Sequence, residues 1–168
     1  MDSAPDLERL WAPWRHRYLV QQRGRRRCFF CAAARSAADR RHRVIARGRR
    51  AFALLNLYPY NNGHVLIAPS RHVGRLEGLT VQEWTDILRL SQRLVGRLRA
   101  ALGAQGFNLG ANLGQTAGAG VPGHFHLHLV PRWRGDTNFM PVVAKTKIVS
   151  QSLDELFRLL AAPSRRRR

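Results

Sequence analysis

Three histidines alternate with apolar residues in one short run of the chain, Gly123-His-Phe-His-Leu-His-Leu-Val-Pro131. Successive side chains on a β-strand point to opposite faces of a sheet, so this spacing places His124, His126 and His128 on one face and the intervening apolar side chains on the other. The run therefore predicts a strand that packs against a core on one side. Three aligned imidazoles on the other side indicate metal ligation or phosphate chemistry.

A catalytic zinc ion bound by all three histidines is one explanation of this pattern. Strand residues two apart can share a metal, but His124 and His128 are four residues apart and each residue adds about 3.3 Å. Attack on phosphorus needs only one neutral imidazole whose other ring nitrogen is held as a donor, and the pKa of an unperturbed histidine is about 6.5. The spacing thus favours phosphorus chemistry over a three-histidine metal centre.

A chain of 168 residues is long enough for one compact domain with a single core. We expect residues 1–27 to form an arm, residues 28–162 to form the domain and residues 163–168 to be a disordered basic tail. The amino terminus has no basic segment followed by an apolar run, and no stretch has the length of a membrane span. The sequence therefore predicts a cytoplasmic protein with no membrane partner.

Two capping boxes and five short apolar segments define the expected fold. Thr80 with Glu83 begins a long amphipathic helix that ends at Gly103, and Ser152 with Glu155 begins a short helix. Strands are expected over residues 43–47, 50–57, 64–68, 106–113 and 124–132. Because short connections favour antiparallel pairing, we predict an α+β fold, with an antiparallel sheet of about five strands, one long helix and a short C-terminal helix.

The charge balance points to an anionic partner. The formal net charge is +19, and only Lys145 and Lys147 are lysines, so nearly all of the 29 basic residues are arginine. Arginine offers planar, bidentate geometry for phosphate, and such a field attracts nucleotides, polyphosphates and nucleic acid. An arginine-rich genome with a solvated protein surface explains the same composition. Charge alone therefore does not name the partner.

Cys28 and Cys31 form a Cys-x-x-Cys pair and are the only cysteines. With no secretory signal, a structural disulfide is disfavoured. Two thiolates at this spacing can hold half of a tetrahedral zinc shell, with distant histidines as the other ligands. Free thiols or redox use are the alternatives, although the arginines before the pair and the alanines after it do not match a thioredoxin-like context.

Two motifs in this order resemble the histidine triad family of nucleotidyl hydrolases and transferases. The family signature His-φ-His-φ-His-φ-φ stands here as residues 124–130, and residues 55–69, which contain His64, resemble the first half of the family's nucleotide pocket. The resemblance runs from about Cys28 to the end of the histidine strand. The segments 56–61 and 131–136, together with Asn138-Phe139, are most similar to bacterial diadenosine tetraphosphate phosphorylases.

This resemblance implies a catalytic role for three histidines. His126 would attack the α-phosphate and form a nucleotidyl-histidine, which water or phosphate then breaks. His128 would contact the bridging oxygen of the departing polyphosphate, and His64 would brace the constellation from the neighbouring strand. The family usually forms homodimers, so a homodimer is expected as well.

The resemblance also implies a set of nucleotide-binding residues. Asn56 matches the position where the family places a polar side chain on the ribose hydroxyls. Asn112 and the backbone amides of Gly118, Gly120 and Gly123 would face the phosphates, because glycine lets the main chain approach an anion. The glycine-rich loop is longer than in the simpler hydrolases, which leaves room for inorganic phosphate as the second acceptor.

Metal-binding members of the family use a Cys-x-x-Cys pair, a histidine after the second central strand and the first triad histidine. Cys28, Cys31, His72 and His124 match these positions. The implied site is a closed, structural zinc site that does not activate water. No catalytic organic cofactor is expected.

The sequence thus predicts a phosphorylase that cleaves dinucleoside polyphosphates such as diadenosine tetraphosphate. One alternative is a hydrolase of nucleoside phosphoramidates or dinucleoside polyphosphates that uses water as the acceptor. Another is a zinc-stabilised, basic nucleic-acid-binding module, or a relative that removes adenylate from DNA ends.

Overall fold

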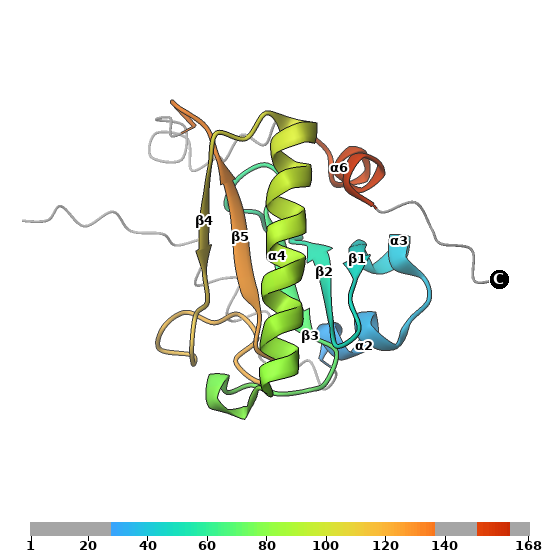
Figure 1. The fold of residues 1–168 in the computed structure, drawn as a ribbon, viewed down its shortest axis with the longest axis vertical. Helices are drawn as coiled ribbons and strands as arrows, with labels where there is room; N and C mark the ends of the chain where they lie inside the picture. The colour runs from blue at the N-terminus through green and yellow to red at the C-terminus, as the bar shows by residue number, and fades with distance from the viewer. Residues whose placement is uncertain (1–27, 137–150, 162–168) are drawn as a thin grey trace, which may run out of the picture.

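Five strands form one antiparallel sheet whose spatial order differs from the sequence order (Figure 1). The computed structural model describes residues 28–136 and 151–161, so the arm predicted over 1–27 and the tail predicted over 163–168 lie outside the described residues. The sheet has the order β1-β2-β3-β5-β4 and contains β1 (Val44–Arg47), β2 (Ala51–Leu55), β3 (Val65–Pro69), β4 (Gly106–Gly110) and β5 (Leu127–Arg132). The predicted α+β class and the five-stranded antiparallel sheet are confirmed.

The long helix α4 (Val81–Leu102) covers one face of the sheet (Figure 1). It begins at the predicted capping box, where Thr80 Oγ1 accepts from the backbone N–H of Glu83, and it ends at Gly103 in the left-handed conformation (φ 62°). The short helix α6 (Leu153–Leu160) begins at the second predicted capping box and packs against α4, β1 and β2. Both helices bury aliphatic side chains against the sheet. These side chains and those of the strands that they contact form the main core.

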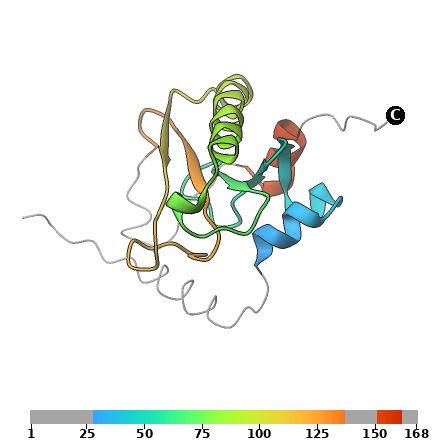
Figure 2. The same cartoon turned by 60° about the horizontal axis from the view of Figure 1, so that its bottom comes forward.

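A second apolar cluster lies on the opposite face of the sheet. The helix α2 (Phe29–Arg35) places Phe30 and Ala33 against Phe52 and Leu54 of β2. Figure 2 shows α4 above the strands and α2 below them, with the one-turn helix α3 (Asp39–His42) beside α2. The middle of the sheet is therefore buried on both faces. The 3₁₀ turn η1 (Leu76–Gly78) lies in the connection between β3 and α4.

The structure corrects three of the predicted boundaries. The histidine strand begins at Leu127 and not at His124, because the backbone N–H of Phe125 donates to Val73 O (2.6 Å) and that of His124 donates to Val121 O (3.2 Å). The fourth strand ends at Gly110 and not at residue 113, and the second covers 51–55 and not 50–57. The helices α2 and α3 were not predicted. Within the described ranges, no helix has both the length and the apolarity that a membrane crossing needs.

Candidate functional site

The three histidines of the alternating run lie on the α2 side of the sheet. Phe30 of α2 has its ring 5.0 Å from the rings of both His124 and His126. The alternate side chains, Phe125 and Leu127, belong to the main core under α4. The alternation of faces holds although the regular strand begins only at Leu127, because the chain leading into β5 keeps burying its side chains on alternate sides.

His126 is buried, and its ring is oriented by the main chain. Its Nδ1 lies 2.9 Å from the carbonyl oxygen of His124. A carbonyl can only accept, so Nδ1 carries the hydrogen and the neutral ring keeps its lone pair on Nε2. Burial lowers the pKa of His126, which favours this neutral form at pH 7. A ring in this state has an unprotonated nitrogen that could act as a nucleophile.

His64 and His128 form a hydrogen-bonded pair across two neighbouring strands. His64 immediately precedes β3, and β3 pairs with β5 so that Leu66 lies opposite His128. The backbone N–H of Tyr60 donates to His64 Nδ1 (2.9 Å), which must therefore be an acceptor, and His64 Nε2–H donates to His128 Nδ1 (3.0 Å). A neutral His128 then carries its hydrogen on Nε2.

The two histidines that flank Leu127 thus have opposite tautomers. His126 has a lone pair at Nε2, whereas His128 has an N–H at Nε2, and their ring centroids are 5.0 Å apart. A lone pair beside an N–H donor is the pairing that a displacement at phosphorus needs, because one nitrogen attacks while the other donates to the departing oxygen.

Among the residues expected to bind the nucleotide, Asn56 directly contacts a site histidine, His64. Asn56 follows β2, and its Nδ2 lies 3.2 Å from His64 Nδ1. Asn112 is half-buried and lies in the loop between β4 and β5. In the same loop the N–H of Gly118 donates to Gln115 O (2.9 Å), while Gly120 is half-buried. Gly123 is exposed, and a Cβ added there would lie 3.9 Å from the ring of His72.

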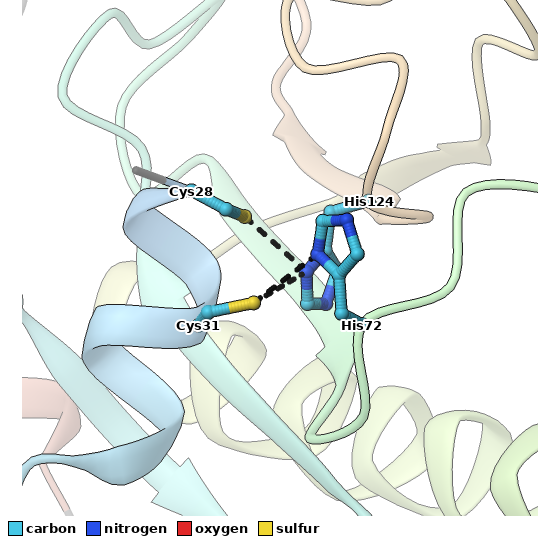
Figure 3. Close-up of side chains that lie close together, drawn as sticks. All are labelled: Cys28, Cys31, His72 and His124. Carbon is cyan, nitrogen blue, oxygen red and sulfur yellow. Dashed lines mark hydrogen bonds between the residues drawn. The ribbon is translucent and has the colours of Figure 1, made fainter. Parts of the chain in front are cut away.

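Four side chains from three separate segments converge beside this site (Figure 3). Cys28 and Cys31 come from the start of α2, His72 from the connection after β3, and His124 from the turn before β5. The distances to Nδ1 atoms are 3.4 Å from Cys28 Sγ to His124, 3.6 Å from Cys31 Sγ to His124 and 3.2 Å from Cys31 Sγ to His72. The predicted ligand set is brought together.

The geometry of this cluster and the neutral ring of His124 suit a tetrahedral metal ion. All four ligand atoms lie within 4.8 Å of one another, and zinc bonds of about 2.0–2.3 Å place ligand atoms about 3.3–3.8 Å apart. His124 Nε2–H donates to Pro69 O (2.9 Å), so its Nδ1 lone pair faces the two sulfur atoms. Burial lowers the pKa of His124 to about 4, which keeps the ring neutral and its Nδ1 lone pair available to a metal ion. Burial also raises the pKa of the Cys31 thiol, so a metal ion that binds there must displace the thiol proton. The cluster could bind a metal ion.

His124 belongs to both sites. Its ring faces the two cysteines, while its carbonyl oxygen accepts from the ring of His126. The same residue thus contributes a side chain to the cluster and the main-chain acceptor that orients His126.

Residues 38–135 match the family model described as the HIT domain. The chain belongs to the histidine triad family. A relative named AP-4-A phosphorylase from Mycobacterium tuberculosis is 38% identical over 162 residues, which is 92% of this chain and 83% of the relative. The bis(5'-adenosyl)-triphosphatase of Dictyostelium discoideum is 38% identical over 85 residues, which is 51% of this chain and 56% of that enzyme.

A solved structure of the family has a similar fold. The zinc-bound histidine triad family protein from Mycobacterium smegmatis superposes with a TM-score of 0.63 at 27% identity, over 79% of this chain and 89% of that chain. The recognition of the family from the two sequence motifs, and the predicted fold class, are thus confirmed.

Sequence reasoning did not identify the part that Tyr60 plays in the site. Besides its backbone contact to His64, its ring stacks on the ring of His128 (centroids 5.6 Å apart, planes 5° apart). The signal available in the sequence was the pair of tyrosines, Tyr58 and Tyr60, in the turn before His64. The main-chain groups of His124, Pro69 and Tyr60 also orient the site histidines through hydrogen bonds. Residue type does not predict these contacts.

Proposed function

We propose that this chain is a nucleotidyl-transferring enzyme that cleaves dinucleoside polyphosphates, of which diadenosine tetraphosphate is the model substrate, through a nucleotidyl intermediate on His126. The observation that carries the proposal is the pair of opposite tautomers, a lone pair on His126 Nε2 and an N–H on His128 Nε2. The similarity to a relative named AP-4-A phosphorylase supports the substrate class.

In the first step His126 Nε2 attacks the α-phosphorus, a P–N bond forms, and the bond from phosphorus to the bridging oxygen breaks. The departing polyphosphate keeps the electron pair and takes a hydrogen bond or proton from His128 Nε2. The His124 carbonyl accepts from Nδ1–H of the modified ring and stabilises the positive charge that develops there. The nucleotidyl group is then held on the enzyme.

In the second step an oxygen of inorganic phosphate attacks the same phosphorus, and the electron pair of the P–N bond returns to His126. With diadenosine tetraphosphate the products are ATP from the first step and ADP from the second. Water as the acceptor gives AMP instead. The similarity to a bis(5'-adenosyl)-triphosphatase makes hydrolysis the second candidate function.

We assign the ribose to Asn56 and the phosphates to Asn112 and the amides of the glycine-rich loop, in particular Gly120 and Gly123. Asn56 contacts His64 at the start of β3, and the glycine-rich loop leads directly into the turn that carries His124 and His126, so both proposed contacts adjoin the triad histidines. Glycine lets the main chain donate N–H groups to an anion at close range.

A zinc ion on Cys28, Cys31, His72 and His124 completes the proposal. The four donors use every position of a tetrahedral ion, so the ion would be structural and would hold α2 against the turn that carries His124. The zinc-bound relative supports this choice of metal.

We also propose that the enzyme is a cytoplasmic homodimer. Strand β4 lies at one edge of the sheet, and its Leu109 is 51% exposed, which supports pairing of this edge with a second copy. Light scattering of the purified protein measures the mass in solution and tests the dimer.

The test of the proposed reaction uses diadenosine tetraphosphate labelled at the α-phosphates. Rapid acid-free denaturation of the wild type should trap a labelled, acid-labile protein adduct, and the His126→Gly variant should trap none. Product analysis then separates the acceptors: labelled ADP that appears only with added phosphate indicates a phosphorylase, whereas labelled AMP indicates a hydrolase. Turnover without an adduct on His126 contradicts the mechanism.

A further inference from the structure

The side chain of Asn56 is held in one orientation by its neighbours. Its Oδ1 accepts from the backbone N–H of Tyr58 (3.0 Å), so its Nδ2 must point the other way. That direction leads to His64, whose Nδ1 lies 3.2 Å from Asn56 Nδ2. The two residues are also paired through the main chain, where Asn56 N–H donates to His64 O (2.9 Å). The amide therefore faces the ring with a donor and not with an acceptor.

Two N–H donors converge on the same ring nitrogen of His64. One is the backbone N–H of Tyr60 (2.9 Å) and the other is the side-chain amide of Asn56 (3.2 Å). Each of them disfavours a hydrogen on Nδ1, because that hydrogen would point at another hydrogen. The hydrogen of a neutral His64 is thereby kept on Nε2, where it donates to His128 (3.0 Å).

We propose that Asn56 is a positioning residue that sets the tautomer of His64 and, through it, holds the hydrogen of His128 on Nε2, where a departing oxygen can accept it. This inference rests on the proposed function for its catalytic meaning. It assigns Asn56 a role beyond the ribose contact, and the two roles are compatible because an amide nitrogen has two hydrogens and only one is directed at His64.

The substitution Asn56→Asp tests the proposal with almost no change of shape. A carboxylate can accept from Tyr58 N–H as the amide does, but its second oxygen faces His64 Nδ1 and draws a hydrogen onto that nitrogen. The imidazole ¹⁵N chemical shifts of the folded protein report directly which nitrogen of His64 is protonated. We expect Nδ1 of His64 to have the shift of an acceptor nitrogen in the wild type and that of a protonated nitrogen in Asn56→Asp.

The kinetic arm uses two esters of AMP that differ only in the leaving group, the phenyl ester and the p-nitrophenyl ester. Phenolate is the more basic leaving group and depends more on a donor from His128. We expect kcat for the phenyl ester to fall about tenfold or more in Asn56→Asp, and kcat for the p-nitrophenyl ester to fall by less than about threefold. The surface variant Gln92→Ala, on the exposed side of α4, should match the wild type with both esters.

A residue that only binds ribose gives a different result. It would raise KM for both esters equally and leave the His64 shifts unchanged, and that outcome overturns the proposal. The variant Asn56→Ala provides a second check, since loss of one of the two donors should weaken but not reverse the tautomer preference. If the wild type cleaves neither ester, the proposed function fails, whereas the ¹⁵N shifts still decide whether Asn56 controls His64.

Discussion

The two faces of strand β5 and of the turn before it are built from the same alternating run but have opposite character. The side chains toward α4 are aliphatic or aromatic and belong to the main core, whereas those toward α2 are imidazoles with defined hydrogen-bond partners. The α4 side needs only volume and burial, and many apolar side chains can supply these. On the α2 side, the proposed reaction requires that the rings of His126 and His128 each carry their hydrogen on a particular nitrogen. The pleat of one strand thus separates the face that packs the main core from the face that carries the proposed chemistry.

The substitution His126→Asn is the sharpest way to break the chemistry on one face without disturbing the other. An asparagine amide can still donate to the His124 carbonyl, but it has no lone pair for attack on phosphorus. We expect turnover of diadenosine tetraphosphate to fall at least about 10³-fold, with a midpoint of thermal unfolding close to that of the wild type. Activity within tenfold of the wild type contradicts the assignment of the nucleophile.

Removal of one metal ligand tests whether the α2 face also contributes to stability. The variant Cys28→Ser should lose one equivalent of zinc, as measured by elemental analysis of the purified protein. At a free zinc concentration about 1,000 times Kd, the bound ion stabilises the wild type by about 4 kcal/mol, and the variant lacks this term.

A chelator supplies the matched control for the metal prediction. It should lower the unfolding free energy of the wild type to that of Cys28→Ser and leave the variant unchanged. A variant that keeps its zinc, or a wild type that is insensitive to chelation, contradicts the proposed ligand set.

The core face has a different expected response. Leu129 is fully buried in β5 and belongs to the cluster under α4. The substitution Leu129→Ala should cost about 3 kcal/mol of unfolding free energy in urea, because it removes apolar contacts and leaves a cavity. Turnover per folded molecule should change far less than in His126→Asn. A thousandfold loss of activity in this variant would mean that the two faces are not independent.

The parts of the fold that were predicted are those with strong local signals. The Thr80 and Ser152 capping boxes place the starts of α4 and α6, and the alternation of histidine with apolar residues places the site on one face of the sheet. The four residues of the candidate metal site were predicted by matching family positions. These features depend on residue type at fixed spacing, which a sequence displays directly.

The parts that were missed depend on tertiary contacts or on the main chain. Helix α2 has no side-chain cap at Cys28, and it is stabilised by Phe30 and Ala33 packed on the sheet, so its alanine-rich sequence gives no clear boundary. The late start of β5 follows from the contact between Phe125 N and Val73 O. The tautomers of the histidines likewise follow from backbone groups, and residue types do not encode where those groups point.

The ion pair between Arg71 and Glu83 links the connection after β3 to the start of α4. Its loss should give the smallest of the predicted decreases in unfolding free energy. Glu83 belongs to the capping box of α4, and Arg71 precedes the metal-cluster residue His72. The Arg71 guanidinium donates to both carboxylate oxygens (2.9 and 2.8 Å) and, as the main cause, lowers the pKa of Glu83 to about 2. Arg71 itself is half-exposed, which weakens the pair through solvent screening.

We expect Glu83→Gln to cost about 1–2 kcal/mol of unfolding free energy at pH 7. A carboxylate whose pKa is lowered on folding stabilises the protein fully above its unfolded pKa of about 4.5, and this term is lost as the pH falls through the folded value of about 2. The difference between wild type and Glu83→Gln in urea unfolding should therefore be constant from pH 7 to about pH 5 and shrink below it. A difference that persists unchanged at pH 2.5 would mean that the charge on Glu83 contributes nothing, and that the amide disturbs the start of α4 by its packing alone.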